Sequence, residues 1–256
     1  NQVVNKGATS TALVSDANPS VSGQSVIFTA TVTATMPATG TPVGSVSFFD
    51  GATNIGTVAL NGSGVATLSI STLTVASHPI TAVYAGNVNY LTSTSSMVDQ
   101  VVSPSGSTTA LASSINPSVF GQSVTFTATV TVAPPATGTP AGNVDFFDGA
   151  TNIGTVVLNG SGIATLSTSS LSVGSHAITA VYAGNATFAT STSSAVTQVV
   201  DKALTGTAVL SVANPSVSGQ SVAFTATVTT TAPGAGTPVG SVDFFDGATN
   251  IGTVAI

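Results

Sequence analysis

The sequence predicts an all-β protein built as a tandem array of two-sheet sandwiches, and three observations support this. The stretch Asn18-Pro-Ser-Val-Ser-Gly-Gln-Ser-Val26 returns at Asn116, with Phe120 in place of Ser22, and again unchanged at Asn214, which sets a repeat of 98 residues. Short alternating apolar segments follow one another at intervals of about ten residues with turn residues between them, as in a β-sandwich. No helical period is present. A repeat of this length can bury its own core and therefore indicates a series of domains.

Seven strands are expected in each unit. Between residues 25 and 33, Val26, Phe28, Ala30 and Val32 alternate mostly with threonine, so one face of this strand belongs to the core. Asp50-Gly51 supplies a tight turn between two such segments. The predicted strands of the first unit are residues 11–14, 25–33, 44–49, 55–60, 65–69, 79–84 and 95–102.

The repeat also predicts where the units begin and end. We expect the end of a preceding copy at 1–4, complete units at 5–102 and 103–200, and an incomplete third unit at 201–256. Ile256 aligns with Leu60 and Leu158, before the last three predicted strands of a unit. A half-sandwich exposes its core face. We therefore expect the array to continue into further copies, with strands donated by a neighbouring chain as the alternative.

Composition excludes several functions. Charged residues make up 4% of the chain, with two lysines and no arginine, so there is no basic surface for nucleic acid or anionic membranes. No apolar run approaches the roughly 20 residues of a membrane-spanning helix. Cysteine is absent, which removes disulfides and thiol chemistry. Near-identical units in series suit a stalk, spacer, fibre or multivalent binder better than an enzyme, which needs one well-made site.

Several motifs together resemble the bacterial immunoglobulin-like (Big) repeats of cell-surface and secreted proteins, group 3 in particular. They are Gly23-Gln-Ser-Val26, Phe28-Thr-Ala-Thr31, Val46-Ser-Phe-Phe-Asp-Gly51 and His78-Pro-Ile-Thr-Ala-Val-Tyr-Ala-Gly86. All recur in the second unit, with Asp145 in place of Ser47 and Ala177 in place of Pro79. The resemblance implies an Ig-like sandwich. It also implies a role as an adhesin stalk, a spacer in a secreted enzyme or part of a surface fibre.

Candidate catalytic and metal-binding residues are few. His78 and His176 are the single histidines of their units, and no cysteine or glutamate completes a zinc site, so we expect them exposed near a turn at the start of a strand. Tyr84 and Tyr182 are expected to tie a loop, as corner tyrosines do in Ig-like folds.

The aspartates give no convincing ion site either. Calcium needs several converging oxygens, and each loop offers one carboxylate. Asp50, Asp148 and Asp246 are expected to act as turn residues, which leaves Asp16, Asp99 and Asp201 as the remaining candidates for a linker ion. We therefore predict no catalytic residue, no metal and no cofactor.

The paired phenylalanines are the one repeated feature that suggests a contact. Successive strand residues point to opposite faces, and Val46 and Phe48 face inward, so Phe49 is expected to point outward. The same holds for Phe147 and Phe245. These three residues are the predicted assembly contact, with packing under the following loop as the alternative.

We predict a non-catalytic extracellular or cell-surface structural protein, a tandem Ig-like stalk or fibre. Its expected partners are other copies of itself or neighbouring repeats, without nucleic acid and without membrane insertion. Two alternatives remain: a multivalent adhesin that binds a glycan or host protein, and a spacer region of a larger secreted enzyme. Recognition loops should diversify, whereas Asp-Gly-Ala-Thr-Asn-Ile-Gly is identical in all three units. This identity favours architecture over recognition.

Overall fold

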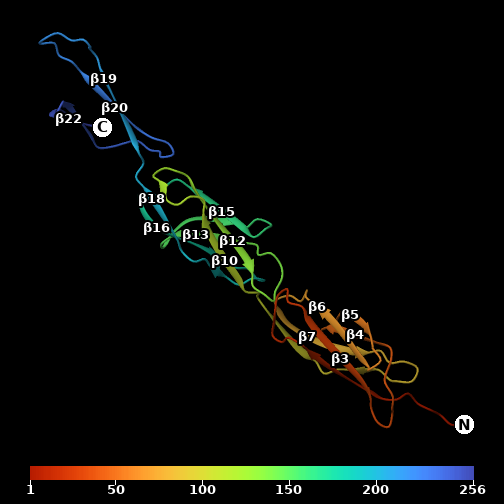
Figure 1. Ribbon diagram of the computed structural model, residues 1–256. Coiled ribbons are helices and arrows are strands. Elements are labelled where there is room, and N and C mark those ends of the chain that lie inside the picture. The colour runs from red at the N-terminus through yellow and green to blue at the C-terminus, as the bar shows by residue number, and fades with distance from the viewer.

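The computed structural model describes all 256 residues, and every regular element in it is a β-strand. The units follow one another in a line, with the N-terminus at one end of the array and the third unit at the other (Figure 1). The prediction of an all-β tandem sandwich is therefore confirmed. In the structure, no helix has the length and apolar character that crossing a membrane requires.

The first unit contains nine strands arranged in two sheets. A three-stranded antiparallel sheet has the order β1-β3-β6, and the other sheet runs β2-β9-β7-β4-β5, with β8 paired to β7. The strands are β1 (Thr9–Ser15), β2 (Ser20–Val21), β3 (Val26–Ala34), β4 (Ser45–Asp50), β5 (Thr53–Ala59), β6 (Val65–Ile70), β7 (Ala76–Tyr84), β8 (Ser93–Thr94) and β9 (Val98–Ser103). All seven predicted strands are present, but β2 and β8 were not predicted.

The second unit repeats this arrangement strand for strand. Its sheets are β10-β12-β15 and β11-β18-β16-β13-β14, with β17 paired to β16. The strands are β10 (Ser107–Ser113), β11 (Ser118–Val119), β12 (Val124–Val132), β13 (Asn143–Asp148), β14 (Thr151–Val157), β15 (Ile163–Thr168), β16 (Gly174–Tyr182), β17 (Ser191–Thr192) and β18 (Val196–Asp201).

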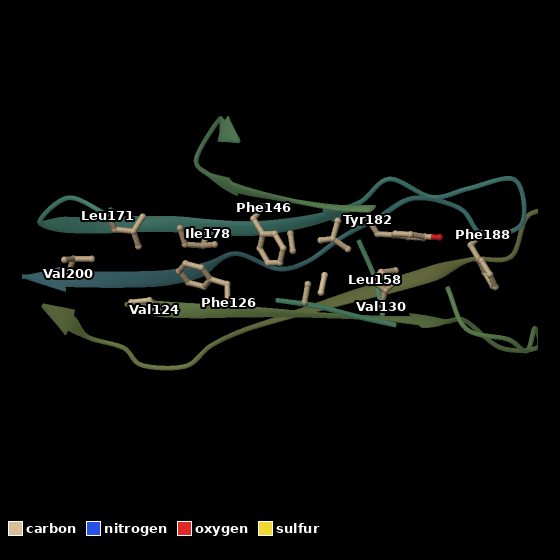
Figure 2. Close-up of a cluster of buried hydrophobic side chains, with 14 residues drawn as sticks. Val124, Phe126, Val130, Phe146, Leu158, Leu171, Ile178, Tyr182, Phe188 and Val200 are labelled. Atoms are coloured by element: carbon tan, nitrogen blue, oxygen red, sulfur yellow. The ribbon is translucent and has the colours of Figure 1, made fainter. Parts of the chain in front are cut away.

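The core of each complete unit lies between its two sheets. In Figure 2 the side chains of β12, among them Phe126 and Val130, face those of Phe146, Ile178 and Tyr182 on the opposite sheet. The alternation predicted for residues 25–33 holds, because Val26, Phe28, Ala30 and Val32 are buried. Burying each large apolar side chain contributes about 1.5–3 kcal/mol, so this double layer holds a unit together without disulfides.

A bulge shapes the hairpin of β4 and β5. Phe48 pairs with Gly56 but Phe49 pairs with Asn54, so Ile55 is the extra residue of β5. Ile55 packs against the core. A methyl group added at Gly56 would lie 2.7 Å from Leu68 Cδ1, so a side chain at this position would displace Leu68.

The strands that follow β18 form two separate two-stranded sheets, β19-β20 and β21-β22. Phe224 is 48% exposed, whereas the equivalent Phe28 and Phe126 are fully buried. The strands are β19 (Thr205–Ser211), β20 (Phe224–Thr230), β21 (Ser241–Asp246) and β22 (Thr249–Ala255).

Candidate functional site

The predicted contact residues lie on the outer face of the larger sheet. Phe48 is completely buried, whereas the next residue, Phe49, is only half-buried and is not part of the core cluster. Its paired neighbours on the flanking strands are Asn54 and Thr81. Because directly paired residues share a face, Phe49 is an apolar ring among uncharged polar groups.

The same placement recurs in the other units. Phe147 is half-buried next to the fully buried Phe146, and Phe245 is 59% exposed. The three rings therefore stand on corresponding strands, β4, β13 and β21, one in each unit. Their role in assembly remains a proposal that these positions support.

The histidines are not exposed, and the prediction on this point was wrong. His78 is 7% exposed and lies within β7, where its Nδ1 is 2.7 Å from Asp50 Oδ2 and its Nε2 is 2.9 Å from the Thr74 carbonyl oxygen. His176 makes the same contacts with Asp148, at 2.6 Å, and with the Ser172 carbonyl, at 2.8 Å. Asp50 and Asp148 are thus partners of a histidine and not merely turn residues.

Both ring nitrogens of each histidine face an oxygen that can only accept a hydrogen bond. A neutral imidazole carries one N–H and satisfies one of these oxygens, whereas an imidazolium satisfies both. For His78, burial lowers the pKa, but the hydrogen bond to Thr74 and the bond and charge of Asp50 outweigh it, so the pKa lies above 6.5. For His176, the Ser172 hydrogen bond raises the pKa, burial opposes it, and Asp148 raises it further.

The melting temperatures of both complete units are expected to fall as the pH rises through these raised values. The unfolded imidazole titrates near 6.5. The stabilisation from each pair is therefore complete below pH 6.5 and is lost as the folded histidine deprotonates. Calorimetric melts between about pH 5 and about pH 9 measure the effect.

The double variant Asp50→Asn, Asp148→Asn is the matched control for the pH series, because it keeps the side-chain size but removes the charge. Its melting temperatures should depend less on pH than those of the parent. A parent whose melting temperatures do not fall across this range, or a variant with the same slope, contradicts the assignment of charged histidines.

Two buried glutamines were missed from the sequence. Gln100 is fully buried: its Oε1 accepts a hydrogen bond from Ser15 Oγ at 2.6 Å, and its Nε2 donates to the Ala17 carbonyl at 2.8 Å and to Ser20 Oγ at 3.1 Å. Gln198 is equally buried and accepts from Ser113 Oγ at 2.6 Å. Each glutamine fastens the segment that crosses between the two sheets onto the last strand of its unit.

The repeated Asn-Pro-Ser-Val motif supports the same crossing. Asn18 Nδ2 donates to the Asp99 carbonyl at 2.7 Å, and Asn18 Oδ1 accepts from the Val101 amide at 3.0 Å. Asn116 makes the equivalent pair of bonds with Thr197 and Val199. The repeated Asn-Pro-Ser-Val motif therefore fastens the crossing segment to the last strand of each complete unit.

The tyrosines tie loops as expected. Tyr84 and Tyr182 are fully buried and donate to the carbonyls of Val43 and Ala141, at 2.8 Å each. Burial raises the pKa of both phenols, so they stay neutral donors.

Two of the linker-ion candidates each accept a hydrogen bond from the protein. Asp16 Oδ1 accepts from the Ile27 amide at 2.8 Å, and Asp99 accepts from the Ser77 hydroxyl. The structure brings no three His, Cys, Asp or Glu side chains together as a metal site requires.

Solved structures similar to this chain are modular proteins. The fibronectin(III)-like modules of Clostridium thermocellum CbhA share 17% identity, with 74% of this chain and 94% of that one covered and a TM-score of 0.31. The Escherichia coli adhesin FdeC shares 17% identity over 94% of this chain and 80% of that one, with a TM-score of 0.32. The Yersinia pseudotuberculosis adhesin InvE shares 17% over 73% and 58%, with a TM-score of 0.34. Similarity at this level does not transfer the function of those proteins.

No curated protein matches the chain. The bacterial Ig-like domain (group 3) matches it twice, at residues 13–103 and 111–201. These two matches cover most of the chain and fall on the two complete sandwiches. The chain therefore belongs to the bacterial Ig-like domain family, group 3.

Proposed function

We propose that this chain is a non-catalytic structural segment of an extracellular or cell-surface protein, an extended stalk or fibre made of Ig-like repeats. The observation that carries the proposal is that the units stand end to end in one line (Figure 1), with the same internal bonds in each complete unit. The longest strands have 9 residues and span roughly 30 Å, so successive units add length rather than a new site.

Direct inspection of native material by electron microscopy tests this proposal. A stalk or fibre is expected to appear as thin projections or filaments from the cell surface that antibodies against residues 103–200 decorate along their length. Labelling confined to the cytoplasm contradicts the proposal. Binding of the purified chain to a glycan or host-protein array favours the adhesin alternative, and labelling of a soluble secreted enzyme favours the spacer alternative.

We further propose that the outward rings make lateral contacts between chains. Replacing Phe49, Phe147 and Phe245 with serine is expected to leave the protein monomeric at concentrations where the parent associates. Each ring is partly solvated, so the substitution should cost a unit only about 1 kcal/mol of folding stability. Sedimentation velocity over a concentration series measures association.

A matched control removes three exposed apolar side chains from the other sheet of the sandwich. Val14, Ile27 and Leu210 are all exposed, and replacing them with serine should leave association unchanged. A parent that stays monomeric throughout, or a phenylalanine variant that associates as the parent does, contradicts the lateral contact.

A further inference from the structure

The junction between the first two units is short and bonded on both sides. Only three residues, Pro104, Ser105 and Gly106, separate β9 from β10. Ser105 is completely buried. Its hydroxyl donates to the Ser22 carbonyl of the first unit, its amide donates to the Thr187 carbonyl of the second at 2.8 Å, and its carbonyl accepts from the Ala189 amide at 2.8 Å. The linker is therefore held by both units.

A turn of the first unit also contacts a loop of the second directly. The turn is residues 21–24, and the Ser22 amide anchors it to the Ser103 carbonyl at 2.9 Å, at the end of the last strand. The carbonyl of Gly23, at its tip, accepts a hydrogen bond from Thr137 Oγ1 at 3.1 Å. Thr137 lies in the loop 136–138 of the next unit.

Glycine is required at the tip of this turn for two reasons. Gly23 has a φ of 76°, which L-residues with a side chain rarely adopt. A methyl group there would also lie 2.5 Å from the Thr137 carbonyl oxygen, a backbone atom that cannot rotate away. The second reason concerns the neighbouring unit and not the fold of the first.

The second junction repeats the arrangement with different side chains. The Phe120 amide donates to the Asp201 carbonyl at 2.8 Å, and the Ala235 amide donates to the Phe120 carbonyl at 3.1 Å. A methyl group on Gly121 would lie 2.7 Å from Ala235 Cβ. The docking geometry therefore persists although Ser22 is replaced by Phe120 and Thr137 by Ala235.

We propose that the turn at residues 21–24, and its copy at 119–122, is a docking element that recognises the 136–138 loop of the following repeat and fixes the orientation of successive units. Short interdomain contacts normally permit relative motion. At the first junction the buried linker serine and the docked glycine restrain the two units from two sides, so this junction is stiff. The partner of this surface is another repeat of the same kind, whatever function the array serves.

Spin-label distances in the full chain test the proposal. The chain has no cysteine, so Ser63→Cys and Ser161→Cys place one label at the same exposed turn of each complete unit. Pulsed dipolar spectroscopy of this parent should give one narrow distance distribution. Adding Gly23→Asn should make the distribution about twofold broader, because asparagine tolerates the positive φ but its side chain forces the turn away from Thr137.

Two controls separate docking from backbone strain. Gly51 has a φ of 57° and Gly219 a φ of 84°, and a methyl group on either meets nothing within 4 Å. Gly219 occupies the same turn in the third unit, so Gly51→Asn and Gly219→Asn should leave the distance distribution as it is in the parent.

A second pair of substitutions keeps the test decisive if Gly23→Asn unfolds the first unit. Ser105→Ala together with Thr137→Val removes both hydroxyl donors of the junction without changing the turn, and should also broaden the distribution. A broad distribution in the parent, or a narrow one in every folded junction variant, overturns the proposal. Neither result bears on surface location or filament formation, which the microscopy tests separately.

Discussion

Replacing Phe146 with alanine is expected to destabilise the second unit by about 3–5 kcal/mol. Phe146 is completely buried at the centre of the sandwich, where Figure 2 shows it opposite Phe126. The substitution leaves a cavity between the two sheets, and the closely packed strands cannot move together to fill it. Each kcal/mol lowers the melting temperature of a unit of this size by about 4–8 °C, so calorimetry of the full chain should show one strongly shifted transition.

The adjacent residue provides the control for this substitution. Phe147→Ala removes the same ring from the outer face of the same strand, where it is half-buried. The loss should be about 1 kcal/mol, in proportion to the smaller area taken from water. Equal shifts for the two variants would mean that Phe147 belongs to the core, which would also remove the structural basis for a lateral contact.

Alternation predicted the main strands correctly because their burial is local and periodic. Val26, Phe28, Ala30 and Val32 recur at every second position, and such a run has only one face to bury. The two-residue strands β2 and β8 carry no measurable period. Each forms by pairing with a longer strand that the rest of the sheet holds in place. β2 pairs in parallel with β9, about eighty residues away in the sequence, and β8 pairs with β7.

The polar interior was missed for a related reason. His78 and Asp50 are 28 residues apart, on neighbouring strands, and only the sheet register makes them partners. Nothing within the strand of His78 indicates that one ring nitrogen faces a carboxylate and the other faces a carbonyl oxygen. In the same way Gln100 resembles a solvent-facing residue until the crossing segment is placed over it.

The alternation of inward and outward residues predicted that the second phenylalanine of each pair points outward. It did not predict which residues surround that ring. The bulge at Ile55 shifts the register of β5, so that Asn54 and not Ile55 stands beside Phe49. An insertion of this kind depends on the packing of Ile55 and Leu68 inside the sandwich. A pattern of two residues per period cannot reveal it, and the half-buried state of Phe49 therefore comes from the structure.

Replacing Gln100 with leucine is expected to destabilise the first unit by about 2–4 kcal/mol, although leucine is apolar and similar in size. The substitution leaves the hydroxyl of the buried Ser20 without its Gln100 donor, and it leaves the half-buried Ser15 hydroxyl and Ala17 carbonyl with only their longer 3.3 Å bond to each other. Each buried polar group that loses its partner costs about 1–3 kcal/mol, which outweighs the gain from a more apolar side chain. Calorimetry of the full chain measures the shift of one transition.

Two comparisons identify the hydrogen bonds as the cause. Gln2→Leu changes the same residue type at an exposed position and should leave every transition in place. Gln100→Glu keeps the shape and the acceptor for Ser15 but loses the donors to Ala17 and Ser20 and buries a charge, so it should be more damaging at neutral pH than leucine is. Because β1 and β9 lie at the two ends of the first unit's sequence, this side chain joins the two ends of the unit. A leucine variant as stable as the parent would show that apolar packing alone holds the crossing segment in place.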